Sequence, residues 1–185
     1  MKIRQLGTAC AAVAGALLVF NAGNLRAQGV QRSVSFGVQA GPTLALGDFG
    51  DDFDAGYHFG ALLGFRSPAS PIGFRLDGTW HSNDAKGADF HMRTILVTAN
   101  IEYEFPSQST IAPYLIGGVG LGNVKLIDDD GDNDGEAQNK FAWNAGGGLK
   151  LKLAGFNMFA ETRFNSIMTE DSSLNMLPIT VGIVF

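Results

Sequence analysis

Apolar and polar residues alternate with a period of two along most of the chain. Seven segments show this alternation: 34–44, 57–66, 72–81, 95–105, 141–152, 158–165 and 177–185. A glycine-rich segment, 112–124, has a less regular pattern, in which we place Leu115, Val119 and Leu121 on the apolar face. Because successive side chains of a β-strand point to opposite faces, the pattern predicts eight strands, each with one apolar and one small or polar face.

The connections between these segments alternate in length. Three are short: 67–71, 106–110 and 154–156. Four are long: 45–55, 82–90, 125–139 and 166–175. Strands of about ten residues are long enough to cross a bilayer when tilted, and short turns on one side with long loops on the other are typical of outer-membrane barrels. The sequence therefore predicts an all-β protein, an eight-stranded antiparallel up-and-down transmembrane β-barrel, with the long loops outside the cell.

The charged residues follow the same division. Of the 18 acidic residues, 14 lie in the four long connections, and the rest take the polar, inward-facing positions of the strands. Basic residues in the strands, Arg66 among them, share these positions. Only Arg93 takes a position on the apolar face of a strand, close to a loop end.

The lumen of an eight-stranded barrel is only wide enough for side chains. We therefore predict a lumen charge network of Arg75, Asp77, Glu102, Glu104, Lys150, Lys152, Glu161 and Arg163. The network either closes the barrel as a structural element or forms a gated path for small ions, and its individual pairs are not predicted.

A soluble eight-stranded sandwich or barrel is the alternative, in which the large residues would turn inward. Three features favour the membrane barrel: the polar face is rich in glycine, as a small crowded interior requires, aromatic residues fall near strand ends, and the chain ends on an apolar residue. The aromatic residues are Tyr57, Trp80, Tyr103, Phe105 and Trp143.

The N-terminal segment has the composition of a secretory signal peptide. Lys2 and Arg4 precede a short apolar run, and small residues offer a cleavage point after Ala27. We therefore predict a signal peptide at 1–27 and one barrel domain at 28–185, which lacks cysteine because Cys10 is the only one.

Three stretches resemble a known family: GYHFGALLGFR, APYLIGGVGLG and the last strand, PITVGIVF. With the strand pattern they are similar to the small eight-stranded outer-membrane barrels represented by the OmpA transmembrane domain and OmpX. The resemblance implies this fold and an outer-membrane location, and it implies that Phe185 is part of the terminal signal read by the barrel-assembly machinery. No peptidoglycan-binding domain is expected after the barrel.

An acidic motif lies in the third long connection. The sequence reads D-x-D-x-D-G from Asp130 to Gly135, but the twelfth position of a calcium-binding EF-hand loop would fall on Phe141, inside a strand. The motif therefore predicts no EF-hand. It leaves two interpretations: a weak Ca²⁺ or Mg²⁺ site formed by Asp130, Asp132 and Asp134, or a solvated loop. No other cofactor is predicted.

We predict no catalytic residues. The candidates for a nucleophile and its base are His58, His81 and His91 with scattered serines, and HSND at 81–84 matches no lipid A-modifying motif. The sequence has no phosphate-binding loop and no basic patch for nucleic acid.

The sequence thus favours a monomeric barrel with a closed polar lumen and a structural or surface-interaction role. A narrow channel for ions or small solutes is the first alternative, and a lipid A-modifying enzyme is the second. The predicted partners are outer-membrane lipid and lipopolysaccharide, the assembly machinery, and a cationic surface ligand attracted by the acidic outer loops.

Overall fold

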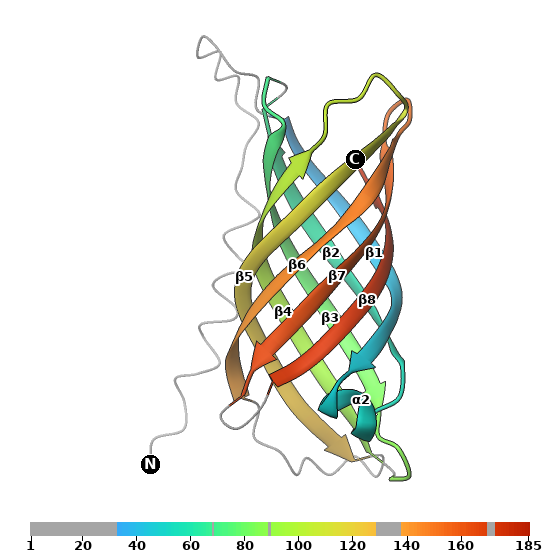
Figure 1. Ribbon diagram of the computed structural model, residues 1–185, viewed down its shortest axis with the longest axis vertical. Coiled ribbons are helices and arrows are strands. Elements are labelled where there is room, and N and C mark those ends of the chain that lie inside the picture. Colours follow the sequence, from blue (N-terminus) through green and yellow to red (C-terminus); the bar gives the residue numbers. More distant parts are fainter. Residues whose placement is uncertain (1–32, 68, 89, 129–137, 170–172) are drawn as a thin grey trace.

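The computed structural model describes residues 33–67, 69–88, 90–128, 138–169 and 173–185. They form a closed barrel in which each strand pairs antiparallel with the next and β8 returns to β1 (Figure 1). The strands are β1 (Ser33–Leu46), β2 (Gly56–Arg66), β3 (Ile72–Asp84), β4 (Phe90–Glu104), β5 (Ile111–Asp128), β6 (Gln138–Lys152), β7 (Asn157–Met168) and β8 (Ser173–Val184). A short helix, α2 (Asp48–Asp52), lies between β1 and β2. Closure leaves no unpaired sheet edge, and the predicted up-and-down barrel is confirmed. The predicted signal peptide lies outside the described residues.

The barrel exposes its apolar face. Phe36, Phe74 and Leu121 are 61 %, 60 % and 60 % exposed, whereas Arg75 and Asp77 on the other face of β3 are buried. A soluble barrel would have the opposite arrangement, and a continuous apolar surface of this kind marks contact with a membrane. The soluble alternative is therefore wrong. None of the described helices is long and apolar enough to cross a membrane.

The irregular fifth strand faces as predicted. Leu115, Val119 and Leu121 point outward and are exposed, while Tyr114 and Ile116, on either side of Leu115, point into the lumen and are buried. The glycines of this strand obscure its alternation in the sequence, but the pleat is regular.

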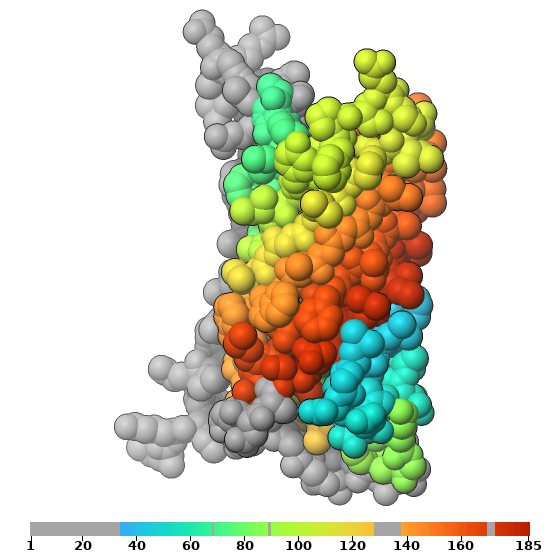
Figure 2. Space-filling model, in the orientation of Figure 1, coloured from blue at the N-terminus to red at the C-terminus, as the bar shows by residue number. Residues whose placement is uncertain are grey.

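Aromatic side chains form belts on the outer wall near both ends of the strands. At the loop end, the Trp80 ring lies 5.6 Å from Tyr57 and 5.0 Å from Phe59 between ring centroids. At the short-turn end, Tyr103 and Phe105 meet edge to face at 5.1 Å. Aromatic rings at both interfaces are typical of transmembrane barrels. Figure 2 shows the outer wall over β5 to β8 as a close-packed surface on which neighbouring strands form diagonal bands.

The outer connections are shorter than predicted. β3 continues to Asp84 and β4 begins at Phe90, so that the connection predicted at 82–90 is reduced to 85–89. The connections predicted at 125–139 and 166–175 are shortened in the same way by longer flanking strands. The prediction was wrong because it placed polar residues such as Ser82 and Asn83 in solvent, whereas both are buried in continued β-pairing.

Inward-facing glycines occupy places where no β-carbon fits. A β-carbon built on Gly120 would lie 2.0 Å from the carbonyl oxygen of Val97 on β4, and one on Gly146 would lie 2.1 Å from that of Thr162 on β7. Outward-facing Gly78 has open space instead. The glycine-rich inner face therefore allows the strands to pack closely around a narrow lumen.

We expect Gly120→Ala to destabilise the barrel, because the new methyl group must displace a backbone carbonyl. Overpacking of this kind costs about 1–3 kcal/mol. The measurement is the urea concentration that half-unfolds the protein refolded in detergent. Gly78→Ala is the matched control and should leave the midpoint unchanged, so equal midpoints for the two variants would contradict the packing argument.

Candidate functional site

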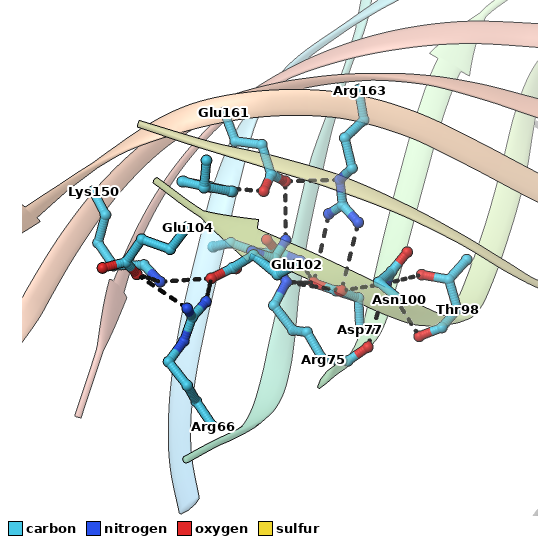
Figure 3. A network of polar contacts seen from close by, with 12 residues as sticks. Arg66, Arg75, Asp77, Thr98, Asn100, Glu102, Glu104, Lys150, Glu161 and Arg163 are labelled. Carbon is cyan, nitrogen blue, oxygen red and sulfur yellow. Dashed lines mark hydrogen bonds and ion pairs between the residues drawn. The ribbon is translucent and has the colours of Figure 1, made fainter. Parts of the chain in front are cut away.

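A layer of ion pairs crosses the lumen about midway along β3 (Figure 3). Arg75 Nε lies 3.0 Å from Asp77 Oδ2, and Arg75 Nη2 lies 2.9 Å from Glu161 Oε1. Arg163 Nε lies 2.7 Å from Glu161 Oε1, and its Nη1 lies 3.4 Å from Asp77 Oδ2. The two arginines balance the two carboxylates. Because β3 and β7 lie on opposite sides of the closed barrel, these pairs connect the two walls directly.

Neutral side chains complete this central layer. Asp77 also accepts hydrogen bonds from Gln39 Nε2 at 3.1 Å and from Asn100 Nδ2 at 2.7 Å. The Tyr114 hydroxyl donates to Glu161 Oε2 at 2.7 Å. Buried charges remain stable only when ion pairs and hydrogen bonds replace their hydration, and these three residues supply hydrogen bonds from β1, β4 and β5.

A second charged layer lies nearer the short-turn end. Lys150 Nζ lies 2.7 Å from Glu102 Oε1 and 3.1 Å from Glu104 Oε2, and Lys152 Nζ lies 2.7 Å from Glu104 Oε1. Arg66 contacts Glu102 and lies 3.6 Å from Glu104 Oε2. We call these three cations and two carboxylates the basic layer. Arg75 of the central layer also reaches it, with Nη1 3.6 Å from Glu102 Oε2, so the two layers touch.

A cavity of about 680 Å³ contains this layer, and we call it the vestibule. Its lining runs from Ser67, Pro71 and Ser107 in the short turns to Arg75 and Phe159 beside the central layer. The vestibule therefore opens at the short-turn end, which in outer-membrane barrels faces the periplasm.

On the loop side of the central layer, two histidines form a hydrogen-bonded chain with three threonines. Thr43 Oγ1 lies 3.0 Å from His58 Nδ1 and 3.1 Å from His81 Nδ1. The Nε2 atoms lie 3.0 Å from Thr180 Oγ1 and 3.0 Å from Thr79 Oγ1, respectively. The rings stack with centroids 5.1 Å apart. A hydroxyl both donates and accepts, so one threonine can satisfy both imidazoles.

An apolar cluster closes the loop end of the lumen, and we call it the outer plug. Its buried members are Phe49, Phe53, Met92, Leu96, Ala142, Ile167 and Met176. Phe49 and Phe53 come from the first outer connection, where α2 places them one turn apart with ring centroids 4.8 Å from each other. Gly47 at the helix start has φ 60°, which glycine adopts without strain. At the lower right of Figure 1, α2 lies at this end of the barrel, next to the end of β1.

All eight residues of the predicted charge network face the lumen, but they belong to two layers rather than one. Four form the central layer, and Glu102, Glu104, Lys150 and Lys152 belong to the basic layer. The prediction omitted Arg66 from the network, and it missed the neutral partners and the outer plug. The i, i+4 spacing of Phe49 and Phe53 was a usable signal for the plug; a lumen-facing Gln, Asn or Tyr gives no comparable signal.

The remaining predicted sites have different outcomes. Asp130, Asp132 and Asp134 lie outside the described residues, and within the described ranges no three metal-ligating side chains form a cluster.

Phe185 is described: its backbone exchanges hydrogen bonds with Phe36 of β1 at 3.1 and 2.8 Å, and the two rings stack at 5.5 Å. The last residue therefore joins the seam between the first and last strands.

This geometry defines a class of protein, a closed transmembrane β-barrel with a side-chain-filled lumen. A family model described as the outer membrane protein beta-barrel domain matches residues 12–185, and the chain belongs to this family. It is an outer-membrane protein. The match begins before the predicted cleavage point, which stays a prediction.

Solved structures of small outer-membrane barrels share the fold. Neisserial surface protein A has a TM-score of 0.63 at 18 % identity, covering 83 % of this chain and 97 % of that one. The N-terminal β-barrel domain of Pseudomonas aeruginosa OprF has a TM-score of 0.51 at 17 % identity, covering 84 % and 100 %. The outer membrane enzyme PagL has a TM-score of 0.51 at 14 % identity, covering 82 % and 98 %. None of the curated proteins compared matches the sequence. At these identities the likeness shows the fold alone.

Proposed function

We propose that the chain is a non-conducting, non-catalytic barrel that stabilises the outer membrane and interacts through its outer face. The observation that carries this proposal is the double obstruction of the lumen. The central layer spans the barrel from β3 to β7, and the outer plug fills the loop end with side chains such as Ile167 and Met176, which are 0 % and 1 % exposed. An ion crossing the barrel would have to break buried ion pairs and then enter an apolar region, and both steps are costly.

The arrangement of His58 and His81 supports a non-catalytic role. Both ring nitrogens of His58 and of His81 contact threonine hydroxyls inside the barrel. A catalytic base needs a nucleophile and a substrate within reach, and these imidazoles face the lumen rather than the lipid.

The outer face supports a surface interaction through its charge. Asp48, Asp51, Asp52 and Asp54 are exposed on and beside α2, and Asp84 is exposed at the end of β3. Such a surface repels lipopolysaccharide phosphates unless Ca²⁺ or Mg²⁺ bridges them, and it attracts cationic ligands. The weak divalent site at Asp130, Asp132 and Asp134 belongs to this proposal.

Deletion and complementation test the proposed role. Cells lacking the gene should become more sensitive to detergents, while uptake of small solutes stays unchanged. The wild-type chain should restore the barrier. A variant with Asp48, Asp51, Asp52 and Asp54 changed to Asn should restore it too, but should lose binding of cationic ligands to the cell surface. Loss of small-solute uptake with an intact barrier would favour the channel instead.

Binding of a cationic peptide to the purified barrel should weaken as salt rises. We expect the affinity for an oligolysine probe to fall at least severalfold between low and physiological ionic strength, because exposed charges are screened beyond about 8–10 Å. The four-aspartate variant should show weaker binding and a smaller salt dependence. Salt-independent binding would contradict an electrostatic outer face.

A further inference from the structure

We propose that the vestibule is a binding site for a small amphipathic carboxylate that enters from the short-turn end. This inference is independent of the proposed function, since it concerns the opposite end of the barrel and requires no passage through the lumen.

The first argument is the charge of the basic layer. The central layer is neutral, because Arg75 and Arg163 are matched by Asp77 and Glu161. In the basic layer, by contrast, Arg66, Lys150 and Lys152 face Glu102 and Glu104, and Glu102 is also contacted by Arg75. The central layer has no carboxylate in excess, so the two layers together keep a surplus of one positive charge. A surplus charge that is partly withdrawn from water favours the entry of one anion.

The second argument is the surplus of hydrogen-bond donors. A guanidinium has five N–H donors and an ammonium has three, whereas the two carboxylates offer about eight acceptor positions to these three cations and to Arg75. Lys152 has a single ion-pair partner among the described residues and its side chain is 43 % exposed. Together with Arg66 it can donate to a second carboxylate at the mouth of the cavity without breaking the existing pairs (Figure 3 shows Arg66 and Lys150 converging on the same two glutamates).

The third argument is the apolar inner end of the vestibule. Leu62, Phe159 and Val184 line it, and Leu62 and Phe159 belong to a buried cluster with Tyr114 and Ile116. A cavity of about 680 Å³ is of the size that accepts small organic ligands. A ligand with an apolar group against this end and its carboxylate at Lys152 and Arg66 satisfies both halves of the site.

The probe for this site is 4-fluorobenzoate, titrated into the protein folded in detergent micelles and followed by ¹⁹F NMR. We expect saturable binding to the wild-type barrel. Lys152→Gln removes the surplus charge at an exposed position and should weaken binding at least about fivefold. Lys140→Gln is the matched control, because it makes the same change in net charge at the opposite end of β6 and should bind as the wild type does. A heat-dependent shift in gel mobility verifies that each variant is folded.

Neutral 4-fluorobenzamide separates charge recognition from partition into the micelle. It should bind much more weakly than the carboxylate. Equal binding of the amide, equal binding by folded Lys152→Gln, or the absence of saturable binding to the wild type would each overturn the proposal. None of these results would bear on whether the lumen conducts.

Discussion

Asp77→Asn is expected to cost about 3–5 kcal/mol of unfolding free energy, the range for removing one partner of a buried ion pair. The Asp77 carboxylate accepts from Gln39, Arg75, Asn100 and Arg163. An amide of the same shape has one acceptor oxygen in place of two and no charge. Two buried arginines would then share Glu161 as their carboxylate partner in the central layer. The measurement is urea unfolding of the refolded barrel.

The control for this prediction is Asp84→Asn on the same strand. Asp84 is exposed at the loop end of β3, and surface substitutions usually change stability by less than about 0.5 kcal/mol. A destabilisation by Asp77→Asn no larger than that of the control would mean that the central layer does not hold the barrel together.

Thr43→Val should produce the second large loss of stability. The substitution keeps the shape of the side chain but removes the hydroxyl between His58 and His81. It leaves two buried ring nitrogens without this partner, at about 1–3 kcal/mol for each. The expected result is a lower urea midpoint than for Thr180→Val, which removes a hydrogen-bond partner from His58 alone.

The comparison of the two threonine variants tests the hydrogen-bonded chain of histidines and threonines. If Thr43→Val and Thr180→Val have the same midpoint, Thr43 does not link both imidazoles. If both variants have the midpoint of the wild type, the hydrogen-bonded chain contributes nothing measurable to stability.

The strands could be predicted because the membrane imposes a strict alternation on them. Lipid excludes charge from one face, so Arg75, Asp77, Glu161 and Arg163 had to share the other face. Their positions in the sequence therefore identified the lumen. The pairs themselves could not be predicted, because Arg75 and Glu161 meet only after β3 and β7 are placed opposite each other by closure of the barrel.

The ends of the strands were harder to predict than their faces. Polar side chains in a barrel sequence occur both in solvent and in a polar lumen, so Asn83 and Ser166 were predicted to lie in loops. Both are buried, at 2 % and 4 % exposure. The vestibule likewise depends on how far Lys150, Lys152 and Arg66 reach across the lumen. The alternation of apolar and polar residues in the sequence does not encode this reach.

Single-channel current through the refolded protein in a planar bilayer tests the central claim, a lumen closed by its own side chains, most directly. A heat-dependent gel shift first verifies that the barrel is folded, and a variant lacking residues 128–136 is recorded beside the wild type. We predict no discrete openings from either protein, because none of the residues that define the central layer and the outer plug lies within the deleted segment. Discrete openings in the wild type would contradict the account and make the ion pairs of Arg75 and Glu161 a gate.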